Sequence, residues 1–136
     1  MIPTIPAGWK AIRVSGVEDT AAKLPEFLAT PGKHAVFWVP ALEMVIWDPW
    51  MIKGLDWLVV AGDSGHQDAK PFVQEWAGHA INSGRRHGVP VFIAQMGSNC
   101  RTWAGNQICH RHPAGARMSE WPVNYRVQQY PSLPSA

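Results

Sequence analysis

The sequence predicts an α/β fold with four parallel strands, two helices and an irregular C-terminal tail. Three observations support this prediction. Short apolar runs of strand length alternate with longer stretches that have helical periodicity. The apolar runs do not alternate with polar residues, which is typical of strands that are covered on both faces and are therefore usually parallel. Parallel strands that are joined by helices give a right-handed α/β arrangement.

The expected elements follow one another along the chain. Residues 1–10 are rich in proline and are expected to be extended on the surface. The core is predicted over residues 11–97, in the order strand, helix, strand, long connection, strand, helix, strand. The strands are predicted at 11–15, 35–39, 55–61 and 89–94, the helices at 18–29 and 69–86, and the aromatic connection at 41–54. Pro25 is unfavourable inside a helix, so the first helix is expected to begin late.

The second helix has the clearest boundaries in the sequence. Asp68 is its expected N-cap, Pro71 is tolerated in its first turn, and Gly88 is expected to end it. The tail, residues 98–136, has few strand signals except at residues 125–130, which predict a late edge strand. Three tryptophans on predicted strands or on the helical stripe are expected in the core: Trp38, Trp57 and Trp76.

Composition limits the classes of protein that the chain can represent. A chain of 136 residues is long enough for one domain, so residues 1–136 are treated as a single domain. A net charge of +2 does not by itself indicate nucleic-acid binding. No apolar run approaches the length of a membrane span, and the N-terminus lacks the features of a signal peptide. Two cysteines do not form a disulfide framework, so a cytoplasmic location is expected.

Several segments resemble a phage and bacterial protein family of uncharacterised function that is radical-SAM-like. Residues 55–65, LDWLVVAGDSG, are similar to the family's IDWVIVGGESG, and residues 88–97, GVPVFIAQMG, are similar to its GVPFFFKQWG. Three shorter matches occur in the same order as in the family: the VED of residues 17–19, the AKP of residues 69–71 with the following Trp76, and the EWP of residues 120–122. The resemblance covers roughly residues 12–130.

The resemblance implies a TIM-like barrel whose first half carries a three-cysteine iron–sulfur motif. This chain is similar only to the second half, and a full barrel takes about 250 residues. The expected fold is therefore half of a TIM-like barrel. No Cys-x3-Cys-x2-Cys motif occurs in the sequence, so no iron–sulfur cluster is expected.

The chain departs from the family at the ends of three predicted strands. Val39 stands where the family has an acidic residue, Ala94 where it has a lysine, and Asp63 where it has a glutamate. Barrel enzymes keep their chemistry at these carboxyl ends. Glu18, Asp63, Ser64 and Gln95 remain there as candidate catalytic groups.

The loop after the third predicted strand is a candidate ligand-binding loop, formed by Gly62, Asp63, Ser64 and Gly65. Glycines let backbone N–H groups approach a ligand, and the following helix N-terminus favours an anion. Two aspartates oppose an anion, however, and no phosphate-loop lysine pattern is present. The alternative is an ordinary turn from strand to helix.

The tail contains a set of residues with the chemistry of zinc ligands: Cys100, Cys109, His110 and His112. Two thiolates and two imidazoles can hold zinc in a tetrahedral site, and such a site would stabilise a poorly packed tail. Their spacing is not a standard one. The alternative is two free cysteines and surface histidines in a loop.

Aromatic and basic residues suggest two further kinds of contact. Trp47 and Trp50 could wall a pocket or face a partner. The tail interleaves Trp103, Trp121 and Tyr125 with basic side chains, which could bind a nucleic acid by stacking on its bases. The alternative is a solvated tail.

Three functional hypotheses follow. The leading one is a reduced, phage-type relative of the barrel family that acts as a binding or assembly module, either as a homodimer or against a partner protein that completes the barrel. The second is a small enzyme that acts on a nucleotide or nucleic acid with Glu18 or Asp63 as the acid or base and with Ser64. The third is a nucleic-acid-binding module that uses the basic aromatic tail. A deep pocket with a perturbed carboxylate would favour the enzyme.

Overall fold

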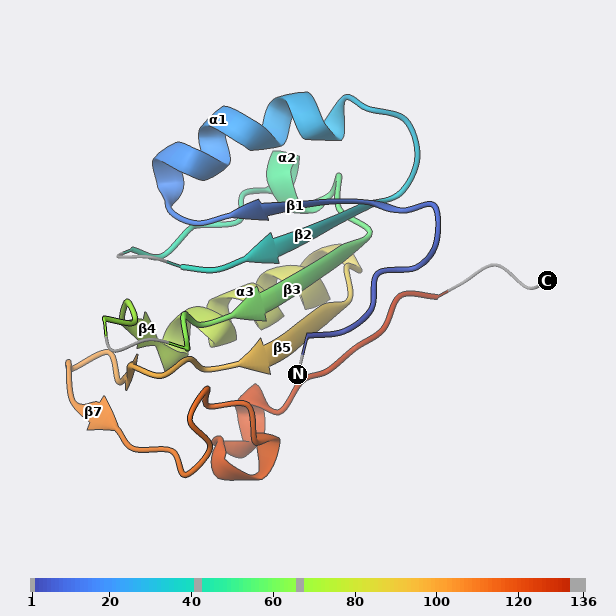
Figure 1. The fold of residues 1–136 in the computed structure, drawn as a ribbon. Helices are drawn as coiled ribbons and strands as arrows, with labels where there is room; N and C mark the ends of the chain where they lie inside the picture. The colour runs from blue at the N-terminus through green and yellow to red at the C-terminus, as the bar shows by residue number, and fades with distance from the viewer. Residues whose placement is uncertain (1, 41–42, 66–67, 133–136) are drawn as a thin grey trace.

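A four-stranded parallel sheet forms the centre of the computed structural model, which describes residues 2–40, 43–65 and 68–132 (Figure 1). The strands are β1 (Lys10–Val14), β2 (His34–Trp38), β3 (Trp57–Ala61) and β5 (Val91–Gln95). They lie in the order β1-β2-β3-β5, and all three neighbouring pairs are parallel. The predicted α/β class with four parallel strands is thus confirmed, with each strand displaced by one or two residues from its expected bounds.

Three helices cover one face of this sheet: α1 (Val17–Leu28), α2 (Pro49–Ile52) and α3 (Gln74–His87). The main hydrophobic core joins alternate residues of the strands to side chains of all three helices, including Leu24 from α1, Ile52 from α2 and Ala80 from α3. Trp38, Trp57 and Trp76 are buried as predicted, with Trp57 on the opposite face of the sheet.

No helix of the described residues lies on that opposite face. A smaller core of six buried strand residues lies there: Ala35, Trp57, Val59, Ala61, Phe92 and Ala94. The N-terminal segment packs on it through Ile5 and Trp9, and the ring of Tyr130 stands 5.7 Å from the ring of Trp57. Strands in sequential order with helices on one face are the arrangement found in a segment of a (β/α)8 barrel.

The first helix lies within one residue of its predicted bounds, 18–29, but the late start expected from Pro25 is wrong, and the second helix begins later than predicted. Pro25 lies well inside α1, which begins at Val17. The missing proline N–H would have bonded to the carbonyl of Ala21, and both residues are exposed, so water can take its place. The second helix begins at Gln74 rather than at residue 69, because the backbone before it is used in strand pairing. Residues 72 and 73 form β4 (Phe72–Val73), which pairs in parallel with β6 (Cys100–Arg101).

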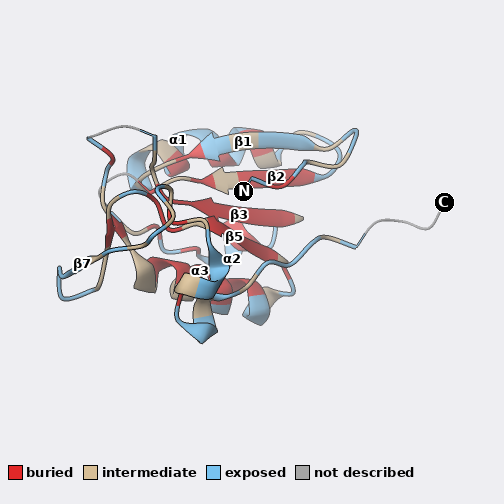
Figure 2. Ribbon diagram, turned by 60° about the horizontal axis from the view of Figure 1, so that its bottom comes forward, coloured by how far each residue is buried: buried red, intermediate tan, exposed pale blue. Residues whose placement is uncertain are grey.

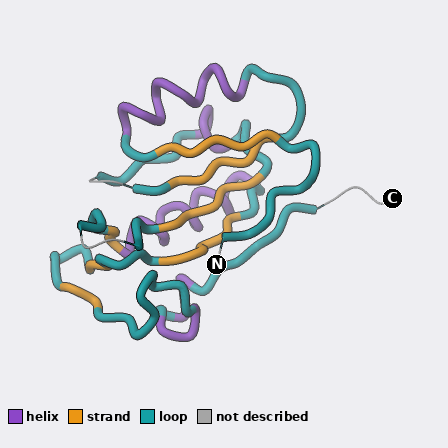
Figure 3. The backbone as a smooth tube through the Cα atoms, in the orientation of Figure 1, coloured by secondary structure: helices purple, strands orange, loops and turns teal. Residues whose placement is uncertain are grey.

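The sequence signals missed several short elements. The aromatic connection contains α2, and the tail contains β6, β7 (Gln107–Ile108) and the 3-10 turns η1 (Met118–Glu120) and η2 (Val123–Tyr125). Most of the tail is otherwise loop (Figure 3).

The predicted ending of the second helix is confirmed, since Gly88 has a left-handed φ of 71°.

The tail pairs with the outer edge of β5. The predicted strand at 125–130 is reduced to a single antiparallel bridge between Phe92 and Gln128. Around it, the N–H of Ile93 donates to the carbonyl of Val127 at 2.8 Å and the N–H of Gln129 donates to the carbonyl of Val91 at 2.9 Å. The indole N–H of Trp57 adds a bond of 2.9 Å to the carbonyl of Gln129. The tail therefore closes one edge of the sheet.

The other edge of the sheet, β1, is open. Within the described residues β1 pairs with β2 alone. Figure 2 shows much of β1 exposed, whereas β3 and β5 are buried. No helix in the described ranges is long and apolar enough to cross a membrane.

Candidate functional site

Two cavities open where the strands of the sheet end. One, of about 490 Å³, is lined by Arg13, Val14, Ser15, Asp19, Lys23, Val39, Pro40, Asp63 and Lys70. The second, of about 340 Å³, is lined by Ile2, Arg13, Phe37, Val39, Ala61, Gly62, Asp63, Ser64 and Gln95. They share Arg13, Val39 and Asp63, so they form one concave region, called here the carboxyl-edge site. Ligands of open α/β sheets bind at this edge.

The loops after β3 and β5 touch each other at the floor of the carboxyl-edge site. The N–H of Gly62 donates to the carbonyl of Gln95 at 2.9 Å, and the Gln95 amide donates back to the carbonyl of Gly62 at 2.8 Å. A Cβ at position 62 would stand 2.4 Å from the carbonyl oxygen of Met96. This close approach of two backbones explains why glycine follows β3.

Ser64 and Gln95, two of the predicted catalytic residues, are brought together. The Gln95 amide nitrogen donates to the Ser64 hydroxyl oxygen at 2.9 Å. Because the hydroxyl accepts this bond, its own hydrogen can be donated elsewhere. Gln95 is not a base, so this contact orients Ser64 and does not activate it as a nucleophile.

Asp63 organises the turn that follows β3. Its carboxylate Oδ2 accepts the N–H of Lys70 at 2.9 Å, and its backbone carbonyl accepts the N–H of Ser98 at 2.8 Å. The predicted N-cap role of Asp68 is wrong, because this turn leads into β4 and the helix α3 begins later, with Val73 as its N-cap. Gly65 has a φ of 88°, which only glycine adopts easily.

Glu18, the fourth predicted catalytic residue, is exposed in the first turn of α1 and lines neither of the two cavities. A different carboxylate, Glu43, reaches the start of α1. Its Oε1 accepts the N–H of Val17 at 2.8 Å, and a Cβ on Gly16 would stand 2.7 Å from this oxygen. The N-terminus of α1 is therefore already paired with an anionic side chain of the same chain.

Asp19 is the second carboxylate that lines the carboxyl-edge site. Burial alone would raise its pKa, but hydrogen bonds from Lys23 and from Ser15 outweigh burial and hold the pKa below its usual value. The Asp19 carboxylate accepts the N–H of Ser15 at 2.9 Å and lies 3.1 Å from the Lys23 ammonium. Asp19 therefore stays ionised at neutral pH and does not serve as a general acid.

Two cations of the carboxyl-edge site were given no role by the sequence analysis. Arg13, next to the last residue of β1, lines both cavities, and Lys70 lines the larger one. The ion pairs found among the described residues involve neither of these two side chains. A cation at the carboxyl end of a predicted strand is the signal that could have identified Arg13.

The predicted zinc ligands do not come together. β6 and β7 pair so that Cys100 stands opposite Ile108, which places the next residue, Cys109, on the other face of the ladder. Cys100 is buried and Cys109 is exposed. The His112 ring nitrogen Nδ1 accepts the N–H groups of Ala114 and Ala116 at 3.2 and 3.3 Å. Within the described ranges, no three His, Cys, Asp or Glu side chains form a group that could hold a metal.

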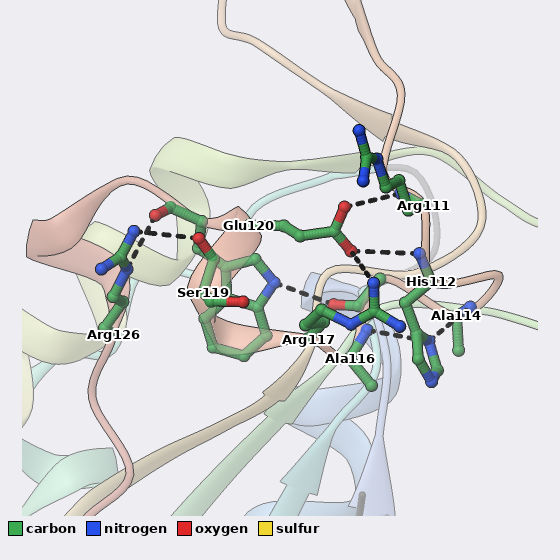
Figure 4. Close-up of polar contacts among 10 residues, drawn as sticks. Arg111, His112, Ala114, Ala116, Arg117, Ser119, Glu120 and Arg126 are labelled. Carbon is green, nitrogen blue, oxygen red and sulfur yellow. Dashed lines mark hydrogen bonds and ion pairs between the residues drawn. The ribbon is translucent and has the colours of Figure 1, made fainter.

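Glu120 organises the irregular tail, and sequence reasoning missed this role (Figure 4). Its two carboxylate oxygens accept the N–H groups of Arg111 and His112 at 2.8 and 3.0 Å, and Arg117 lies 3.9 Å away. These backbone hydrogen bonds lower the pKa of the Glu120 carboxyl. The EWP segment, noted only as a resemblance, contains this residue.

Only part of the predicted stacking set is accessible. Trp121 is buried, and its indole N–H donates to the carbonyl of Gly115 at 2.9 Å, so it cannot stack on a base. Tyr125 is half-buried against α3. Trp103, by contrast, is 68% exposed between β6 and β7, and its backbone N–H is held by Glu75 at 2.7 Å. Arg126 uses its guanidinium on the carbonyls of Trp121 and Ser119.

The two tryptophans of the aromatic connection lie in different environments. Trp47 is buried and packs edge-on against Trp38, with ring centroids 5.7 Å apart. It is a core residue and not a partner contact. Trp50 is 53% exposed on α2 and remains available for a partner.

Comparison of the chain with family models, with curated proteins and with solved structures finds no match.

Proposed function

We propose that the protein is a binding and assembly module: a reduced relative of the barrel family, consisting of half a barrel, that associates through the open edge at β1. The observation that carries this proposal is the difference between the two edges of the sheet. The tail covers β5, whereas β1 has no second neighbour among the described residues. An uncovered edge strand is a template for pairing with another chain.

The hydrogen-bonding groups available on β1 follow from its ladder with β2. The N–H of Lys10 donates to Lys33, and the carbonyl of Val14 accepts the N–H of Val39. Alternate residues of an edge strand point their backbone groups outward, so Ala11 and Arg13 face away from β2. The Arg13 carbonyl is taken by the Lys23 ammonium at 3.2 Å. The Ala11 N–H and carbonyl and the Arg13 N–H are therefore left for a partner strand.

The proposed occupant of this edge is a second copy of the chain. A single open edge is self-complementary under two-fold symmetry, and two-fold dimers are the most common soluble assemblies. The two β1 strands would then pair antiparallel. A different chain that completes the barrel is the alternative occupant.

Substitution of Ala11 by proline tests the proposal. Proline at this position removes an outward N–H and places a ring on the open edge, while it leaves the bonds to β2 intact. We expect the parent protein to dimerise in sedimentation experiments at concentrations up to about 100 μM and Ala11→Pro to be monomeric. Ala11→Thr keeps the N–H and is the matched control. A parent protein that stays monomeric over this range contradicts the second-copy proposal.

The small-enzyme alternative has less support. Asp63, Ser64 and Gln95 share the carboxyl-edge site, but Glu18 lines neither cavity, and the pKa of Asp19 is lowered rather than raised. Turnover of a nucleotide by the isolated protein would reinstate this alternative.

The distribution of charge favours nucleic-acid binding as a second candidate function. Residues 98–136 contain four arginines and one acidic residue, whereas residues 1–97 contain eight cationic and nine acidic residues. Trp103 is exposed within the basic segment. We expect Trp103→Ala to weaken binding of a labelled single-stranded oligonucleotide by about 1–3 kcal/mol in fluorescence anisotropy. Val123→Ala, at another exposed apolar residue of the tail, is the control, and equal losses would contradict a stacking role.

A further inference from the structure

The charges around the carboxyl-edge site do not cancel. Of the residues that the structure describes, three cationic side chains (Arg13, Lys23 and Lys70) and two anionic ones (Asp19 and Asp63) line its larger cavity. Lys23 and Asp19 neutralise each other at 3.1 Å. Arg13 and Lys70 then face a single further carboxylate, Asp63, whose Oδ2 is used by the backbone N–H of Lys70. The described residues that line the larger cavity therefore carry one net positive charge, which favours an anionic ligand there.

The site also contains an uncharged group, the Ser64 hydroxyl, that can donate a hydrogen bond to an anion. The Ser64 hydroxyl accepts the Gln95 amide and can donate its hydrogen into the smaller cavity, which Arg13 also lines. The second hydrogen of the Gln95 amide is fixed on the carbonyl of Gly62, so Gln95 holds Ser64 in place. An arginine fork, an ammonium and a hydroxyl are donors that suit the oxygens of a phosphate group.

The N-terminus of α1 does not contribute to this site. Glu43 already accepts the N–H of Val17, and Asp19 accepts the N–H of Ser15. Recognition of an anion would therefore depend on side chains, and among the lining residues that the structure describes Arg13 is the one cation that lines both cavities.

We propose that the carboxyl-edge site binds a phosphate group, held by Arg13 and Lys70 with a hydrogen bond from Ser64. The phosphate group belongs either to free inorganic phosphate or to a phosphate monoester such as a nucleotide. This proposal does not depend on association through β1, because the site is formed within one chain.

The test is isothermal titration of the full chain with inorganic phosphate and, separately, with adenosine monophosphate, at low ionic strength. We expect saturable binding below about 10 mM. Arg13→Ala and Lys70→Ala are each expected to weaken phosphate binding roughly tenfold or more, since each removes a charge-assisted contact. Arg13→Lys keeps the charge without the fork and should fall between the parent and Arg13→Ala.

Lys10→Ala is the matched control, because Lys10 is an exposed cation at the other end of the same strand. Arg13 and Lys70 are exposed, so their variants should keep the unfolding midpoint of the parent. If adenosine monophosphate binds more tightly than inorganic phosphate, and Arg13→Ala weakens the binding of both to the same extent, the site is assigned to a phosphate monoester. If the two probes bind with equal affinity, the site is assigned to the free anion. Absence of saturable binding of either probe, or an equal effect of Lys10→Ala and Arg13→Ala, overturns the proposal.

Discussion

Two glycines of α3 allow the packing between this helix and the sheet to be measured with a matched pair of variants. A Cβ on Gly84 would stand 2.4 Å from Cγ2 of Val91 and 2.7 Å from the carbonyl oxygen of Val89. A Cβ on Gly78 would stand 3.0 Å from the ring edge of Tyr125. Both positions lie within the helix, so Gly→Ala gains the same helix propensity, about 1 kcal/mol.

The two variants differ in what the new methyl group meets. Val91 is buried on β5, its branched side chain has few rotamers, and the Val89 carbonyl belongs to the backbone. Overpacking of this kind costs about 1–3 kcal/mol, and more where nothing can move. With little room to move, the cost at Gly84 is expected in the upper part of this range, about 2–3 kcal/mol. After the gain of about 1 kcal/mol in helix propensity, Gly84→Ala is expected to lose about 1–2 kcal/mol of unfolding free energy. The half-buried Tyr125 ring can shift by a few tenths of an ångström, so Gly78→Ala should be stabilising or neutral.

Urea denaturation followed by tryptophan fluorescence measures both changes. A loss of about 1–2 kcal/mol moves the midpoint by ~1 M at an unchanged slope. The reasoning fails if Gly84→Ala is as stable as the parent, or if Gly78→Ala is the less stable of the two variants.

Two further predictions concern ionisable groups. Burial, with the nearby carboxylate of Glu75, raises the pKa of the Cys100 thiol to about 12. Iodoacetamide at pH 8 should therefore modify the native protein once, at the exposed Cys109, as counted by mass spectrometry. Modification of both thiols in the native protein would contradict this. The lowered pKa of Glu120 means that its contribution to stability is complete above the ordinary carboxyl pKa of 4.5 and is lost as the pH falls through the lower folded-state value. The urea midpoint of the parent should therefore fall relative to that of Glu120→Gln as the solution is acidified below pH 4.5, and parallel curves for the two proteins would refute the role of the carboxylate.

The central sheet was predictable because its signal is local. In the buried runs around Val36, Val59 and Phe92, apolar residues do not alternate with polar ones. In the structure these strands have a hydrophobic core on each face of the sheet. The order of the strands along the sheet equals their order in the sequence.

Element boundaries and capping residues were harder to predict, because contacts distant in sequence decide them. Asp68 and Pro71 form a convincing helix start by themselves, yet residues 72 and 73 pair with a strand near residue 100, and the helix begins afterwards. Nothing near Val17 in the sequence reveals that Glu43 would bond to its N–H.

The candidate site was predicted in part. Asp63, Ser64 and Gln95 lie together because the loops after parallel strands meet at one edge of the sheet. The zinc set failed for a geometric reason that spacing cannot show: the ladder register places Cys100 and Cys109 on opposite faces.

The tail segment that pairs with β5 also bears on how many neighbours one molecule can have in an assembly. Under the proposed pairing through β1, a sheet with a single open edge has a valence of one, so growth would stop when two molecules have paired. Removing residues 126–132 would uncover β5 and raise the valence to two, and head-to-tail addition could then continue without closing. If the molecules pair through β1 as proposed, the short tail segment would act as a chain terminator, and its loss would convert a discrete particle into a polymer.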